Sequence, residues 1–133
     1  MFTRTLEDVT PVEWGNGTSH RLLTEADKMG FTVCKTLVRA GTNSALQYRN
    51  HLEACYCIGG SGSVVHKDGT VFKITEGTIY VLDEHDPHYL IASEHEDLHL
   101  ISVFNPPLTG TEKHRLSEDG FSQYEAAPAA VQH

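Results

Sequence analysis

GTNSALQYRNHLEACYCIGG, residues 41–60, is the segment of this chain that decides its fold. Five residues separate Gly41 from Gln47, and six separate Glu53 from Gly60. Glycines at both ends favour turns, because glycine adopts backbone conformations that other residues avoid. Glu53 is a charged side chain in the otherwise apolar run 52–55. Such a carboxylate either faces solvent or lies buried with a partner, so the segment predicts a strand with one residue of special interest.

A second segment, GTVFKITEGTIY at residues 69–80, has a related frame. Five residues separate Gly69 from Thr75, and two separate Gly77 from Tyr80. Asp68 and Gly69 favour a hairpin turn just before it, because both residues tolerate the positive φ that such turns need. The two segments therefore predict two turn-bounded strand pairs.

Short alternating runs recur along the rest of the chain at a spacing of about ten residues, which is typical of an all-β sandwich or barrel. A helical turn is expected near residues 24–27. The predicted strands are residues 31–38, 54–58, 62–66, 70–74, 78–82, 88–92 and 98–104.

Length and composition limit the class of protein. With 133 residues, we expect a single domain over residues 1–120. A flexible tail is predicted over 121–133, which ends in a run of small residues around Pro128. No apolar run approaches the roughly 18 residues of a membrane-spanning helix. The first residues lack an apolar core typical of a signal peptide, so we expect a cytoplasmic protein.

The charge balance argues against nucleic-acid binding. Ten basic and eighteen acidic residues give a net charge of −8, whereas phosphate binding needs a concentrated basic face. The acidity is instead expected to serve solubility. Cys34, Cys55 and Cys57 are expected to be reduced and buried, because two more zinc ligands at compatible spacing are not evident.

The two glycine-framed segments resemble the two sequence motifs of the cupins. This resemblance implies a double-stranded β-helix, the jelly-roll barrel of that superfamily. In most cupins the positions of Gln47, Arg49 and Tyr80 hold histidine metal ligands, whereas the glutamate position is the same as here. The resemblance therefore implies an intact barrel with an altered metal site.

Cupin strand pairing would bring Glu53 beside Tyr80, and His88 follows Pro87 at the start of the next strand, within reach of the same point. A carboxylate, a phenolate and an imidazole suit iron or another first-row divalent ion. The plainer alternatives are an ordinary core aromatic for Tyr80 and a surface loop histidine for His88.

Two further residues flank this predicted site. Tyr48 lies between the two altered ligand positions, so its side chain is expected to point away from them unless the strand is bulged. His51 is two residues from Glu53 and is expected to share its face. His51 is a candidate proton carrier or, equally, a hydrogen-bond partner that orients Glu53.

The segment after the last predicted strand is also distinctive. Asn105, Pro106 and Pro107 end that strand, because proline cannot continue a hydrogen-bonded ladder. Glu112 and His114 then follow in a loop that is predicted to fold over the barrel mouth. The alternative is that both are ordinary surface residues.

Several longer segments resemble ectoine synthases. They are NHLEACYCI at residues 50–58, GTIYVLD at 77–83, HDPHYL at 85–90 and VFNPPLTG at 103–110. Arg21-Leu-Leu and Met29-Gly-Phe resemble the N-terminal part of that family, so the resemblance extends over about residues 1–120.

This resemblance implies a homodimeric cupin that closes N-γ-acetyl-L-2,4-diaminobutyrate to the cyclic amidine ectoine with loss of water. It implies a carbon–oxygen lyase with iron(II), or another first-row divalent metal, at Glu53, Tyr80 and His88. It assigns catalytic roles to Tyr48 and His51. The implied substrate contacts are Arg21, Thr36, Tyr48, Glu112 and His114.

The sequence also departs from the family. Gly17 stands where many members have a tryptophan, four residues before Arg21, and this loss is expected to open one wall of the pocket. The strand before Tyr48 also differs. These departures leave open a related N-acyl diamino acid as substrate, or ring opening as the main direction. The alternative functions are a different cupin activity, such as an isomerase or oxygenase, and non-catalytic binding of a small molecule.

Overall fold

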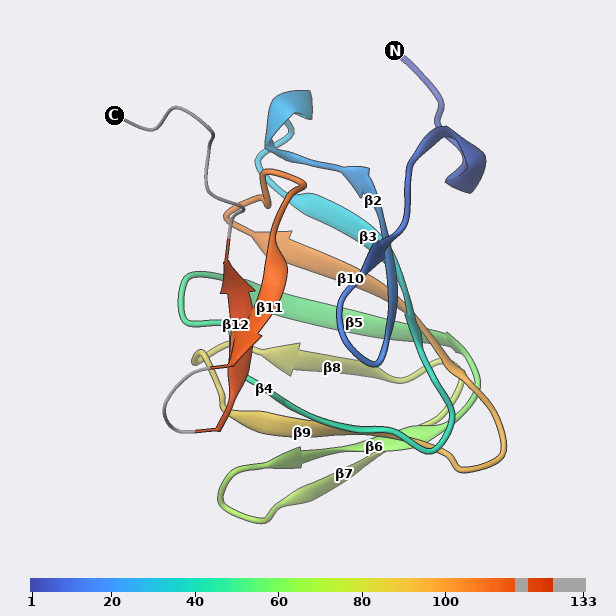
Figure 1. Ribbon diagram of the computed structural model, residues 1–133, viewed down its shortest axis with the longest axis vertical. Helices are drawn as coiled ribbons and strands as arrows, with labels where there is room; N and C mark the ends of the chain where they lie inside the picture. The colour runs from blue at the N-terminus through green and yellow to red at the C-terminus, as the bar shows by residue number, and fades with distance from the viewer. Residues whose placement is uncertain (117–119, 126–133) are drawn as a thin grey trace.

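The computed structural model describes residues 1–116 and 120–125, with the backbone alone at 113–116 and 125. Two six-stranded sheets face each other and form a barrel-like sandwich (Figure 1). The predicted all-β cupin class is confirmed. In sheet order, the first sheet holds β1 (Val12–Glu13), β2 (Gly17–Leu23), β3 (Thr32–Val38), β10 (Leu98–Asn105), β5 (Leu52–Gly59) and β8 (Ile79–Leu82).

The second sheet is formed by the remaining six strands, and it contains the β6–β7 and β11–β12 hairpins. Two short 3-10 turns, η1 (Leu6–Asp8) and η2 (Glu25–Asp27), precede β1 and β3, and the predicted helical turn at residues 24–27 is η2. In sheet order, the second sheet holds β11 (Lys113–Leu116), β12 (Ser122–Glu125), β4 (Asn43–Leu46), β9 (His88–Ala92), β6 (Gly62–His66) and β7 (Val71–Ile74).

All seven strands predicted from alternation are present, with bounds that shift by at most a few residues. Alternation is clearest in β10, where Leu98, Leu100, Ser102 and Phe104 are buried and the residues between them are half-buried. Side chains two apart on a strand share a face, so these four point between the sheets. Alternation did not indicate β1, β2, β11 and β12, which are short or rich in polar residues, and β4 is the strand expected before Tyr48.

The β5–β6 turn is tightly constrained. Gly60 has φ +77°, and a Cβ atom there would collide with the carbonyl oxygen of Asp97. A Cβ on Gly62 would collide with the carbonyl oxygen of Ile91. Only glycine fits both close approaches, so the turn fixes where β5 ends and β6 begins.

The fold extends into the segment that was predicted to be a flexible tail from residue 121. Phe121 and Tyr124 are buried, and β12 pairs with β11 along its length and with β4 at Ser122. Residues 126–133, the rest of that prediction, lie outside the described residues.

Two further expectations concern the chain as a whole. All three cysteines are free and buried, as predicted. Within residues 1–116 and 120–125, no helix is long and apolar enough to cross a membrane. A cytoplasmic location stays a prediction.

Candidate functional site

A row of inward-facing side chains crosses the first sheet from β2 to β8. Strand register places Arg21 opposite Cys34, and Cys34 opposite Ser102. Ser102 is in turn opposite Cys55, and Cys55 is opposite Tyr80. All five side chains are buried. We call this series the transverse row: a guanidinium at one end, a phenol at the other, and three small side chains between them.

Glu53 lies beside the phenol end of this row. It is opposite Leu82 on β8, so it is the diagonal neighbour of Tyr80 on the inner face. Glu53 is only 7% exposed, which rules out the solvent-facing alternative. Burial raises the pKa of its carboxyl to about 8, opposed by a hydrogen bond with the Cys55 thiol. A carboxyl in this position therefore takes up a proton readily at neutral pH.

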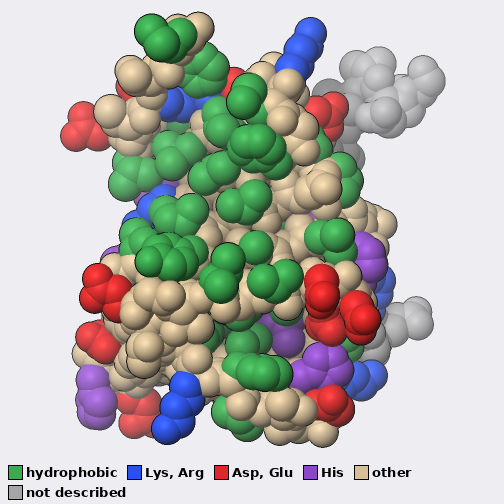
Figure 2. Space-filling model, turned by 180° about the vertical axis from the view of Figure 1, so that it is seen from behind, with side chains coloured by type: hydrophobic (Ala, Val, Ile, Leu, Met, Phe, Trp, Pro, Cys, Tyr) green, Lys and Arg blue, Asp and Glu red, His purple; other side chains and the backbone are tan. Residues whose placement is uncertain are grey.

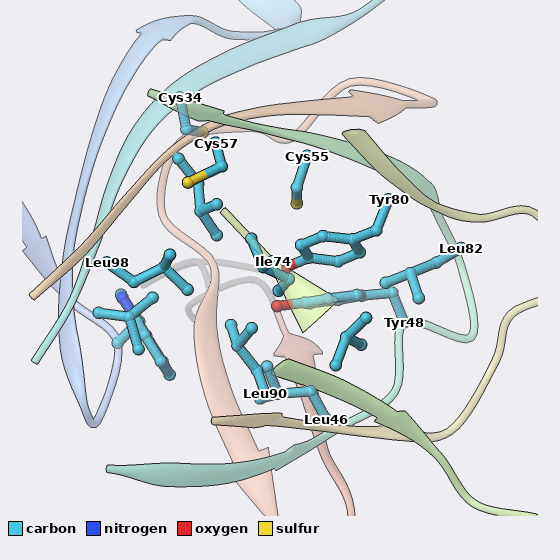
Figure 3. Close-up of a cluster of buried hydrophobic side chains, with 14 of the residues drawn as sticks. Cys34, Leu46, Tyr48, Cys55, Cys57, Ile74, Tyr80, Leu82, Leu90 and Leu98 are labelled. Carbon is cyan, nitrogen blue, oxygen red and sulfur yellow. The ribbon is translucent and has the colours of Figure 1, made fainter. Parts of the chain in front are cut away.

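Tyr80 points into the interior from the edge strand of the first sheet. Figure 3 shows the hydroxyl groups of Tyr80 and Tyr48 turned toward the same part of the interior, with Cys55 beside them. Burial, together with the neighbouring Cys55 and Glu53, raises the pKa of the Tyr80 phenol well above its usual value. A nearby cation is what would favour its phenolate form.

His88 reaches the interior from the second sheet and is 1% exposed. Its Nδ1 lies 2.8 Å from the carbonyl oxygen of Asp86, which accepts only, so Nδ1 carries the proton. The lone pair is therefore on Nε2, and this buried atom has no hydrogen-bond partner in the part of the chain described. Burial also lowers the pKa of the imidazole. A neutral imidazole with a free, buried lone pair suits a metal ligand.

The donor set fits a metal only if the tyrosine takes part. No group of three histidine, cysteine, aspartate or glutamate side chains within the described residues is arranged to hold an ion. Tyr80 lies between the other two candidates, because it shares the internal cavity with Glu53 and a surface pocket with His88. Two oxygen donors and one nitrogen donor suit a first-row divalent ion.

The internal cavity between the sheets is narrow. About 10 Å³ is accessible to the centre of a water molecule, which is room for about one water. Its walls include Thr36, Tyr48, Glu53, Tyr80 and Tyr124. A ligand larger than a single ion or water therefore binds here only if the lining side chains move apart.

The wall that was expected to be open at Gly17 is closed, so that expectation is wrong. Trp14, three residues earlier, is buried, lines the cavity and donates from Nε1 to the carbonyl oxygen of Leu37 at 3.2 Å. A Cβ atom on Gly17 would collide with that same carbonyl. The glycine lets β2 approach β3 closely, and the indole enters from the neighbouring position.

Tyr48 points inward, although a regular strand would turn it away from the altered ligand positions. The chain leaves β conformation between β4 and β5, at residues 47–51. The ring packs at 4.9 Å from Tyr124, 5.2 Å from Phe104 and 6.4 Å from His88, measured between centroids. Burial, followed by neighbouring Tyr124, Glu53 and Tyr80, raises the pKa of its phenol well above the usual value.

His85 holds this irregular segment in place. Its Nδ1 lies 2.8 Å from the carbonyl oxygen of Tyr48 and 3.1 Å from that of His51. Gln47 donates back to the carbonyl oxygen of His85 at 3.0 Å. His85 has φ +54°, a left-handed conformation that is uncommon for residues other than glycine. This interlock, which we call the His85 clamp, ties the segment carrying Tyr48 to the loop before His88.

His51 lies in the irregular segment immediately before β5 begins. Its Nδ1 lies 2.8 Å from the carbonyl oxygen of Pro106, and its ring packs edge-on against Phe104 at 6.0 Å. It lines neither the internal cavity nor the surface pocket. Its predicted catalytic role stays a prediction.

Arg21 is a buried cation with open donors. Its Nη1 donates to the carbonyl oxygen of Gly110 at 3.0 Å, and its Cζ lies 5.1 Å from the ring centroid of Tyr124. Nε and Nη2 are buried and find no acceptor in the described part of the chain. Two adjacent N–H groups of a guanidinium match the two oxygens of a carboxylate.

Glu112 stands next to this arginine, 4.0 Å from Nη1. Burial alone would raise the pKa of its carboxyl, but hydrogen bonds from the backbone amides of Thr109 and Gly110 outweigh it and lower the pKa. Glu112 is therefore a charged partner of Arg21. The backbone of His114 lies in β11 opposite Tyr124, and its side chain lies outside the described residues.

Ser102 and Cys55 belong to the site but were not among the predicted site residues. Ser102 shares a 2.9 Å hydrogen bond with the predicted residue Thr36, and its hydroxyl lies 3.5 Å from the Cys55 sulfur. In the sequence, only inward alternation marked Ser102 and Cys55. Tyr124 falls in the segment that was predicted to be a tail, and its spacing from Phe121 does not match strand alternation.

Comparison with known proteins identifies the family. The family model described as ectoine synthase matches residues 1–126. The chain belongs to the ectoine synthase family. It is 49% identical to the L-ectoine synthase of Halalkalibacterium halodurans over 114 residues, which cover 82% of this chain and 87% of that protein.

Two more relatives agree. The L-ectoine synthase of Desulfatibacillum aliphaticivorans is 46% identical over 127 residues, covering 90% of this chain and 95% of that protein. The crystal structure of the ectoine synthase from P. lautus superposes with a TM-score of 0.79 at 35% identity, covering 100% of this chain and 96% of that one. The family predicted from the sequence is thus confirmed.

The buried carboxyl of Glu53 predicts an unusual pH dependence of stability in chelator-treated protein. Its folded pKa of about 8 lies above the ordinary value of 4.5, so the folded protein keeps a proton that the unfolded chain has released. The free energy of unfolding should therefore fall as pH rises between these two values. Denaturant unfolding across this range measures the slope. Glu53→Gln should flatten it, whereas Glu76→Gln, an exposed control in the β7–β8 turn, should keep it. An equal slope in Glu53→Gln would contradict the assignment.

The His85 clamp predicts that His85→Leu impairs both stability and turnover. The substitution removes the donor to two carbonyls and places leucine at positive φ, with an expected loss of about 2–3 kcal/mol in the free energy of unfolding. Asparagine tolerates this backbone conformation and keeps a donor, so His85→Asn should recover more than half of the stability and of kcat. Denaturant unfolding and steady-state kinetics test this. A His85→Asn protein as damaged as His85→Leu would refute the clamp.

Proposed function

We propose that this protein closes N-γ-acetyl-L-2,4-diaminobutyrate to ectoine with loss of water. The family relationship over nearly the whole chain supports this activity. The observation that carries it is the transverse row, in which the open donors of Arg21 and the phenol of Tyr80 lie at opposite ends of a floor of small side chains. A short molecule with a carboxylate at one end and an amide at the other matches this arrangement.

Arg21 would hold the substrate carboxylate. Its free Nε and Nη2 form the fork that carboxylates prefer. Glu112 fixes the other side of the guanidinium, because its own oxygens are held by the amides of the 109–112 turn. Thr36, midway along the cavity, offers a hydroxyl next to Ser102. With the carboxylate fixed, the α-amine and the acetamide are confined to one small space, which favours attack within one molecule.

Glu53, Tyr80 and His88 would hold iron(II) or a related divalent ion. The free, buried lone pair of His88 Nε2 and the two neighbouring oxygen donors support this assignment. Such an ion, when bound, supplies a Lewis acid for a carbonyl oxygen.

Tyr48 is the best-placed proton donor. Its phenol is buried and its pKa is raised well above the usual value, so it stays protonated at neutral pH and serves as an acid rather than a base. It can hydrogen-bond the oxygen that leaves as water. His51 would help to position the neighbouring backbone rather than carry a proton, since its Nδ1 is hydrogen-bonded to the Pro106 carbonyl.

The direct test is turnover of N-γ-acetyl-L-2,4-diaminobutyrate by purified protein with added iron(II) under anaerobic conditions, with ectoine followed by chromatography. We expect ectoine to form, and to disappear with a chelator and in Glu53→Ala. Arg21→Met should raise KM by about tenfold or more, because a hydrogen bond between charged groups contributes roughly 1.5–3 kcal/mol. The exposed variant Arg39→Met is the matched control. A folded, metal-loaded protein that makes no ectoine would overturn the proposal.

We also propose that two copies associate through the outer face of the first sheet. Figure 2 shows apolar side chains gathered on this side of the molecule. Leu52, Tyr56 and Ile58 of β5 and Ile79 and Val81 of β8 are exposed there, and no outward position of these two strands is charged. A contiguous apolar face of this kind is typical of a protein–protein interface.

The dimer proposal predicts a solution mass of twice the 14.7 kDa of one chain. Tyr56→Asp should give monomers, because it places a charge in the apolar face. Met29→Asp, at an exposed apolar residue in the loop between η2 and β3, should leave the dimer intact. Light scattering after size-exclusion chromatography distinguishes these outcomes. A monomeric wild-type protein would refute the proposal.

A further inference from the structure

A pocket of about 620 Å³ opens where the edges of the two sheets meet, between β8 and the β6–β7 hairpin. This is within the usual range for small-molecule sites. Val64, Phe72, Val81 and Leu82 give it apolar walls, and His66 and Asp86 lie at its polar side. The pocket is far larger than the internal cavity, whose accessible volume is about 10 Å³.

The pocket adjoins the reaction centre. Tyr80 lines both the pocket and the internal cavity, His88 lines the pocket, and Glu53 lines the cavity. The three predicted metal ligands therefore lie at the boundary between the two spaces. Any substrate group held there has the packed barrel on one side and the pocket on the other.

The direction of the bound substrate follows from the transverse row. Arg21 and Tyr80 are at opposite ends of this row, on β2 and β8. A carboxylate on Arg21 thus directs the amide toward the Tyr80 end. β8 is the last strand of this sheet, and Tyr80 also lines the pocket. For an amide held at Tyr80, the pocket therefore lies on the side away from Arg21.

We propose that this pocket is an acyl-group subsite, and that the protein cyclises γ-N-acyl-2,4-diaminobutyrates whose acyl chains are longer than acetyl. The inference rests on the proposed function and adds a substrate class to it. The α-amine forms a bond to the acyl carbonyl carbon, and the carbonyl oxygen leaves as water with two protons that were bound to nitrogen. The alkyl chain remains on the ring carbon between the two nitrogens, and no oxidant or reductant is needed.

Apolar walls strengthen the binding of longer acyl chains only until the chain fills the pocket. Each CH₂ group that becomes buried strengthens binding by up to roughly fourfold. Propionyl and butyryl groups are uncharged and flexible enough to lie against Val64 and Leu82.

The test compares acetyl, propionyl and butyryl substrates in the metal-loaded enzyme. For the wild type we expect all three to be turned over, with kcat/KM rising by up to about fourfold for each added methylene. Val64→Phe, which fills the pocket, should lower kcat/KM for the butyryl substrate by about tenfold or more relative to acetyl. Val65→Phe is the matched control, because its side chain points to the other face of β6, and it should leave the ratio unchanged.

The outcomes separate this inference from the proposed function. If acetyl substrate is turned over but butyryl substrate is not, or if Val64→Phe slows both equally, the subsite is refuted and the synthase remains. If no substrate is turned over, calorimetric titration with the acyl series decides the subsite alone. It stands if butyryl binds as tightly as acetyl and Val64→Phe weakens only the former, and falls otherwise. Circular dichroism checks folding, and Val64→Ile, which adds one methyl group, replaces Val64→Phe if that variant is unfolded.

Discussion

The register of β5 between β10 and β8 is the constraint on which the rest of the site depends. It places Cys55 between Ser102 and Tyr80, and Glu53 between Phe104 and Leu82. A slip of one residue would turn Glu53 and Cys55 to the outer face and bring Ala54 and Tyr56 inside. The glycines after β5 prevent such a slip, because the backbone approaches at Gly60 and Gly62 admit no side chain.

The buried polar groups at the two ends of the transverse row are stabilised in different ways. At one end Arg21 and Glu112 are both charged, and backbone amides and a carbonyl stabilise the pair. At the other end Glu53, Tyr80 and His88 are held in their neutral forms, since burial raises the first two pKa values and lowers the third. The first end is suited to recognise a permanent charge, whereas the second responds to a cation by releasing protons.

The sequence was sufficient to predict the features that depend on local spacing. The positions of Glu53, Tyr80 and His88 follow from the resemblance of the glycine-framed segments to cupin motifs, and all three are buried in the interior. It could not supply the conformations that depend on distant contacts. Tyr48 turns inward because His85, 37 residues later, holds its carbonyl, and the wall at Gly17 is closed because the Leu37 carbonyl approaches that glycine. Tyr124 was missed because its side chain is buried against Arg21, Tyr48 and Phe104, which lie far away in the sequence.

The open donors of Arg21 and the free lone pair of His88 lower the stability of the folded protein. A buried polar atom without a partner destabilises the fold by about 1–3 kcal/mol, and a well-packed core would have replaced such groups with apolar ones. Both are oriented by fixed backbone carbonyls, of Gly110 and Asp86, so the orientation is built into the fold rather than left to the ligand. Binding then requires little rearrangement of these groups. The movement that remains must come from the aromatic side chains, Trp14, Tyr48 and Tyr124, which fill the cavity between the two ends.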